Sequence, residues 1–121
     1  MQIHFKGSNY ELSDQITRLA RRKVEGLKKF CGKDASLARA YVDLGKETEA
    51  HVSGRIWRAD INFDVDGSRF NAKAIEESIE KAIDKAVSEL ASEIKTARKR
   101  EQSLVKKGGG MLKSLMRGFQ P

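Results

Sequence analysis

The fold of this chain is decided by residues 56–73, which read IWRADINFDVDGSRFNAK. From Ile56 to Val65 apolar and polar side chains alternate, so every second residue faces the same side of an extended strand. Asp66-Gly67 is a strong signal for a two-residue hairpin turn, and the alternation resumes from Arg69 to Lys73. The stretch therefore predicts two antiparallel strands with one apolar face, which has to pack against another layer.

Two further strands are predicted upstream of this hairpin. Ile3–Ser8 places Ile3 and Phe5 on one side, and Ala38–Leu44 shows the same alternation. This alternation predicts that each strand buries one face and exposes the other. We therefore expect a single four-stranded sheet with one apolar and one polar face.

Two amphipathic helices complete the pattern. The first is predicted over residues 13–30, with Ser13 as N-cap and Gly32 as the stop. The second is predicted over about 75–100. The expected order is β-α-β-β-β-α, an α+β fold in which both helices pack on one face of the sheet. The apolar stripes that predict the helices are Ile16, Leu19, Ala20, Val24, Leu27 and Phe30, then Ile75, Ile79, Ile83, Ala86, Leu90, Ile94 and Ala97.

Composition limits the function classes. The chain has 121 residues, enough for one main core, and a formal net charge of +7, which favours polyanionic partners. Cys31 is the single cysteine, as expected in a reducing compartment. We find neither a signal peptide nor an apolar run long enough for a membrane span, so we expect a soluble, cytoplasmic protein.

The charge is unevenly distributed. Residues 1–33 carry a net charge of +5, residues 34–94 of −5, and residues 95–121 of +7. We therefore divide the chain into an α+β domain over 1–100 and a basic tail over 101–121, which Gly108-Gly109-Gly110 makes flexible. The tail contains an apolar segment from Met111 to Phe119. Docking of this segment on the domain, on a partner or on a membrane is one interpretation, and disorder is the one we favour.

Cations form a ridge on the outward face of each predicted helix. At 100° per residue, Arg18, Arg22 and Lys29 align on the first helix, with Arg21 and Lys28 beside them. On the second helix the outward stripe holds Lys81, Lys85, Ser88, Ser92, Lys95 and Lys99. A solvated face explains either helix alone, but both together, with the basic 95–100 segment, predict binding to RNA phosphates.

Catalytic and metal-binding patterns are weak. His4 and His51 are the only histidines, and no histidine lies near Cys31 in sequence, so we predict no catalytic residue. Asp60, Asn62, Asp64 and Asp66 resemble a calcium loop only in composition, because they alternate on a strand. We expect no metal, no cofactor and no small-molecule substrate.

The aromatic residues are predicted to pack in the core. Trp57, Phe63 and Phe70 alternate with aliphatic residues on their strands. Tyr41 lies on the opposite face from Val42 and is the better candidate for stacking on a base.

Several segments resemble ribosome hibernation-promoting factors, the ribosome-associated translation inhibitor family. They are Met1–Gly7, Leu12-Ser13 leading into a basic helix, His51-Val52 and Ala82-Ile83-Asp84, and the order of elements is also similar. The sequence differs in two places: Ser78-Ile79-Glu80 replaces the usual Asp-Met-Tyr, and Glu89 and Ser92 replace a Lys and an Arg. The resemblance is to the short form, without an additional C-terminal domain.

The resemblance implies that the protein acts by occupying a binding site on the ribosome, without a chemical reaction. Such proteins bind the small ribosomal subunit in the channel for messenger and transfer RNA, and block translation during stress or stationary phase. It implies no enzymatic activity, and we expect a monomer off the ribosome. The residues implied to bind ribosomal RNA are Arg18, Arg21, Arg22, Lys28, Lys29, Lys81, Lys85, Lys95, Arg98, Lys99 and Arg100.

Two alternatives remain open at this stage. A general double-stranded RNA-binding protein would also pack helices on an antiparallel sheet. A protein-interaction module that modulates transcription would instead act through the acidic sheet face or the tail.

Overall fold

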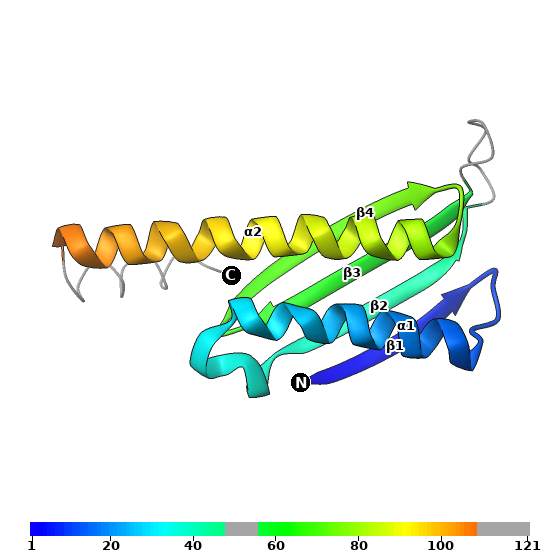
Figure 1. The fold of residues 1–121 in the computed structure, drawn as a ribbon, viewed down its shortest axis with the longest axis horizontal. Helices are drawn as coiled ribbons and strands as arrows, with labels where there is room; N and C mark the ends of the chain where they lie inside the picture. The colour runs from blue at the N-terminus through cyan, green and yellow to red at the C-terminus, as the bar shows by residue number, and fades with distance from the viewer. Residues whose placement is uncertain (48–55, 109–121) are drawn as a thin grey trace.

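The computed structural model describes residues 1–47 and 56–108, which form a four-stranded sheet with two α-helices on one face (Figure 1). The predicted α+β class and the order β-α-β-β-β-α are confirmed. The elements are β1 (Gln2–Ser8), α1 (Asp14–Glu25), the 3₁₀ helices η1 (Gly26–Phe30) and η2 (Gly32–Leu37), β2 (Arg39–Lys46), β3 (Trp57–Val65), β4 (Ser68–Glu76) and α2 (Ile79–Gly108).

The sheet is mixed, with the strands side by side in chain order. β1 pairs with β2 in parallel, and α1 makes the crossover that a parallel pair requires. The pairs β2–β3 and β3–β4 are antiparallel. Asp66 and Gly67 form the predicted hairpin turn, and both have positive φ, 50° and 76°, as a type I′ turn requires.

The core lies between the helices and the sheet. Alternate residues of β2 and β3, among them Val42, Ile61 and Phe63, are buried against Val24 of α1 and Leu90 of α2. Trp57 and Phe70 are partly buried against the same cluster, so the predicted core role of the aromatic residues is confirmed.

The first helix is shorter than predicted. Ser13 is the N-cap, and its Oγ accepts a hydrogen bond from the backbone N–H of Ile16 at 3.1 Å. The α-helix ends at Glu25 rather than near residue 30, because Gly26 has low helix propensity and the chain tightens there into η1. Gly32 has a φ of 63°, the left-handed conformation expected of a glycine stop.

The second helix is shifted along the chain relative to its prediction. β4 continues to Glu76, which pairs with Trp57, so Ile75 belongs to the sheet and not to the helix. Ser78 then accepts a hydrogen bond from the backbone N–H of Lys81 at its Oγ, and α2 begins at Ile79. The helix continues through Gly108 instead of ending near 100, since residues 101–107 contain no helix breaker.

The apolar segment from Met111 to Phe119 and residues His51 and Val52 lie outside the described residues. Within the ranges 1–47 and 56–108, no helix combines the length and apolar character needed to cross a bilayer.

Candidate nucleic-acid interface

The cations predicted on the first helix are all solvent-exposed. Arg18, Arg21 and Arg22 lie on α1, and Lys28 and Lys29 lie on η1. The guanidinium of Arg21 lies 5.3 Å from the ring centroid of Phe5 on β1, so this arginine covers the end of the core while its charge stays in water.

The cations predicted on α2 are also accessible. Lys81, Lys85, Lys95, Lys99 and Arg100 are exposed, and Arg98 is half-buried. A cation row therefore follows each of the two helical segments, as the sequence predicted.

The two helices lie side by side on the same face of the sheet (Figure 1). Lys23 of α1 forms an ion pair with Asp84 of α2, with 2.7 Å between Nζ and the carboxylate oxygen. Packing of both helices on one sheet brings the rows together, although α1 and η1 are far from α2 in sequence.

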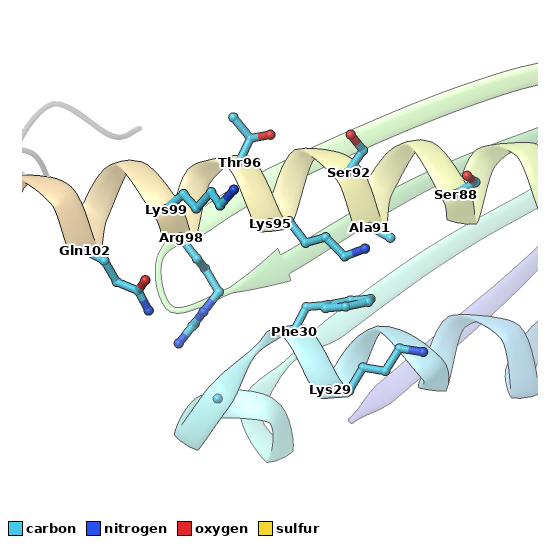
Figure 2. A pocket seen from close by; sticks show the side chains of 11 residues that line it. Lys29, Phe30, Ser88, Ala91, Ser92, Lys95, Thr96, Arg98, Lys99 and Gln102 are labelled. Atoms are coloured by element: carbon cyan, nitrogen blue, oxygen red, sulfur yellow. The ribbon is translucent and has the colours of Figure 1, made fainter.

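The rows meet at a groove between η1 and α2, which we call the Phe30 groove (Figure 2). The groove has a volume of about 670 Å³. Lys29, Phe30 and Gly32 line one side, and residues of α2 from Ser88 to Gln102 line the other. The polar groups on the α2 side are Ser88, Ser92, Lys95, Thr96, Arg98, Lys99 and Gln102.

Phe30 contacts a cation from each row. The Lys29 ammonium is 5.2 Å from its ring centroid, and the Lys95 ammonium is 4.6 Å from it. The helical spacing predicts only a core role for Phe30, because nothing in the local pattern indicates that Lys95, distant in sequence, lies over the ring.

Gly32 has a role beyond ending a helix. A Cβ atom at this position would lie 2.7 Å from a guanidinium nitrogen of Arg98. The glycine thus leaves room for the Arg98 guanidinium at the end of the Phe30 groove, a contact that the sequence pattern does not indicate.

Lys81 and Lys85 are in a different environment. Lys81 lies 3.6 Å from a carboxylate oxygen of Glu77, and Lys85 lies 3.7 Å from one of Glu76. Both lysines remain more than half exposed, so the pairs are weak, but each ammonium has an anion beside it.

The sheet face opposite the helices carries a network of polar pairs. Arg58 lies within 4.0 Å of carboxylate oxygens of Asp43, Glu47 and Asp60. Arg69 donates hydrogen bonds to Asp64, and these bonds raise the pKa of its guanidinium above the ordinary value. Asn71 donates a hydrogen bond to Asp60 at 2.8 Å, so Asp60 and Asp64, two of the residues that resemble a calcium loop in composition, are engaged by basic and amide side chains.

The aromatic pair on this sheet face consists of Tyr41 and His4. Tyr41 is 40% exposed, and its ring stacks on that of His4 with 5.2 Å between centroids. Tyr41 is therefore accessible, but it lies on the face opposite the two cation rows.

Within residues 1–47 and 56–108, the remaining reactive side chains form no cluster. Cys31 is buried, and its Sγ donates to the backbone carbonyl of Leu27 at 3.2 Å. No group of three or more metal-binding side chains occurs in the part of the chain that the structure describes.

A known protein family matches most of the chain. Residues 3–102 match the family described as sigma 54 modulation protein / S30EA ribosomal protein. No curated protein matches the chain.

Two solved structures are similar in fold. The N-terminal domain of Protein Y from Thermus thermophilus shares 26% identity over 79% of this chain and 98% of its own, with a TM-score of 0.66. A ribosomal subunit interface protein from Coxiella burnetii shares 16% identity over 81% and 98% of the two chains, with a TM-score of 0.64.

Proposed function

Because this chain belongs to the sigma 54 modulation protein / S30EA ribosomal protein family, we propose that it binds the small ribosomal subunit and silences translation. Family membership and fold support a ribosome-associated role. The finer proposal is that the chain occupies the channel for messenger and transfer RNA during stress or stationary phase, without a chemical reaction.

The observation that carries the proposal is the meeting of two cation rows on one helical layer. The exposed lysines of η1 lie beside the basic end of α2, and Lys29 and this end of α2 line the Phe30 groove. The exposed arginines of α1 continue the first row along the same helical layer, where Lys23 pairs with Asp84 of α2. Cations spaced along two neighbouring helices can contact several phosphates of a folded RNA and release their counterions.

The mechanism has two steps. Long-range attraction steers the basic helical layer toward the anionic RNA surface and accelerates association at low salt. Once bound, the domain excludes other RNA from the space that it fills. Recognition rests on phosphate contacts and RNA shape rather than on base edges, because the cation rows supply donors to phosphates.

Co-sedimentation with purified small subunits in a sucrose gradient tests the proposal. The unsubstituted chain is expected to move with the small subunit. The triple variant Arg18→Glu, Arg21→Glu and Arg22→Glu reverses the α1 row and is expected to remain at the top of the gradient.

A matched control places the same change on the opposite face. Lys6→Glu, Arg39→Glu and Lys73→Glu reverse three exposed cations on the strands. This control is expected to keep co-sedimenting. Equal loss of co-sedimentation in both triple variants would show that net charge alone causes the effect. That result would contradict an interface on the helical layer.

A further inference from the structure

We propose that Phe30 is a positioning residue that holds the Lys29 and Lys95 ammonium groups so that they grip one segment of ribosomal RNA backbone in the Phe30 groove. The inference rests on the proposed function and adds a residue that is neither charged nor on a cation row. It also names the ligand of the groove as phosphodiester backbone, not a base.

The geometry brings both rows to a single ring. Phe30 is half-buried and packs against the core, so its ring is held in place. The Lys29 and Lys95 ammonium groups lie 5.2 and 4.6 Å from the ring centroid, and Figure 2 shows the ring between the two lysines. One rigid side chain thus sets the positions of two flexible ones from different elements.

The ring attracts an ammonium group without neutralising it. The negative π face of an aromatic ring attracts cations, but the ring carries no net charge. This contact differs from the ion pairs of Lys81 and Lys85, in which a carboxylate offsets the charge. An ammonium group has three N–H donors, so Lys95 can keep the ring contact and still donate to a phosphate.

Restraint of the lysines favours binding. A free lysine side chain loses rotamer entropy when it is fixed on a ligand. The ring limits the conformations of both side chains before RNA arrives, which lowers the cost of ordering them on binding. Hydroxyls of Ser88, Ser92 and Thr96 line the same groove and can add hydrogen bonds to phosphate oxygens.

The same contacts argue against a base in the groove. A base that stacks on Phe30 needs a free ring face, and here ammonium groups lie over the ring. Stacking would displace a lysine from its contact. Backbone binding keeps both contacts, so the groove is expected to bind RNA without sequence preference.

The test measures affinity for purified small subunits at several salt concentrations. Phe30→Leu is expected to weaken binding about tenfold, since it removes both cation–π contacts and their restraint. Phe30→Tyr keeps the ring and is expected to bind within about twofold of the unsubstituted chain. Thermal unfolding of each variant shows whether it is folded at the assay temperature.

A double-mutant cycle separates positioning from packing. Lys95→Ala alone is expected to weaken binding about tenfold and to reduce the slope of log K against log salt by about one, for one lost phosphate contact. In a Phe30→Leu background the same change is expected to cost clearly less, because Lys95 has already lost its restraint. Lys29 and Lys95 are exposed, so their alanine variants report on binding even where Phe30→Leu fails to fold.

The outcomes distinguish the inference from the function on which it rests. If Phe30→Leu binds like Phe30→Tyr, if the two changes are additive, or if the lysine variants bind normally, the positioning role is wrong. The proposed function still stands in those cases, provided that the triple reversal on α1 abolishes binding. If the unsubstituted chain does not bind small subunits, both proposals fail.

Discussion

Residues 76–94 and residues 95–102, which include most of α2, each contain two lysines four residues apart. The electrostatic surroundings of these two pairs of lysines differ. Residues 76–94, the acidic stretch, contain six acidic residues and two lysines. Residues 95–102, the basic stretch, contain four basic residues and one acidic residue. Lys81 and Lys85 have carboxylate neighbours, whereas Lys95 lies over the neutral ring of Phe30.

The comparison shows that helical spacing alone does not define a phosphate-binding surface. A phosphate that approaches Lys81 or Lys85 is repelled by Glu77, Glu76 and their acidic neighbours. A phosphate that approaches Lys95 meets Lys29 and Lys99 instead. We therefore infer that Lys81 and Lys85 contribute less to RNA binding than Lys95 and Lys99, although all four belong to one predicted stripe.

The largest expected effect concerns the inner face of the acidic stretch, which packs in the core. Ile83 and Leu90 are both fully buried in the same core. Truncation of either to alanine is expected to lower the free energy of unfolding by about 2–5 kcal/mol. Denaturant unfolding measures this free energy. A small decrease in it at only one of the two positions would show that the helix is not packed evenly along its length.

Charge reversal on the outer face comes next. Lys95→Glu with Lys99→Glu is expected to weaken binding to small subunits about 100-fold, because two phosphate contacts become repulsive. Lys81→Glu with Lys85→Glu has the same change in net charge and is expected to cost less than about fivefold, since those lysines already have anionic neighbours. Equal losses in the two pairs would remove the distinction between the stretches.

The salt dependence of binding distinguishes the lysines of the two stretches by a smaller effect. Lys99→Ala is expected to lower the slope of log K against log salt by about one, and Lys81→Ala by clearly less. Binding isotherms at four or more salt concentrations measure the slope. An equal change for both variants would mean that both lysines contact phosphates.

The smallest expected effect comes from removing the acids. Glu76→Gln with Glu77→Gln leaves Lys81 and Lys85 in place without their carboxylate partners. We expect binding to tighten about two- to threefold, the effect of relieving weak surface ion pairs. Unchanged affinity would indicate that this end of α2 lies away from the RNA.

The alternation of strand residues and the 3- and 4-residue spacing of apolar residues sufficed to predict the fold. They reflect which side chains the core buries, and each pattern is local in sequence. Boundaries were harder: Ile75 fits a helical stripe by spacing, but pairing of β4 with β3 places it in the sheet. The end of α1 likewise depends on a local change to 3₁₀ geometry at Gly26.

The candidate interface was only partly accessible to sequence reasoning. The outward position of Arg18 or Lys95 follows from helical periodicity. The contacts of Phe30 with Lys95, of Gly32 with Arg98, and of Lys85 with Glu76 join residues from different elements. Such contacts depend on how the helices pack on the sheet, and periodicity within one element does not contain that information.

Site-specific photo-crosslinking is the most direct test of the central claim that the helical layer faces ribosomal RNA. A photoreactive residue is placed at Ser88 in the Phe30 groove and, as a control, at exposed Lys73 on the opposite sheet face. The account predicts cross-links from position 88 to small-subunit RNA and few or none from position 73. Strong RNA cross-links from position 73, with none from position 88, would contradict it.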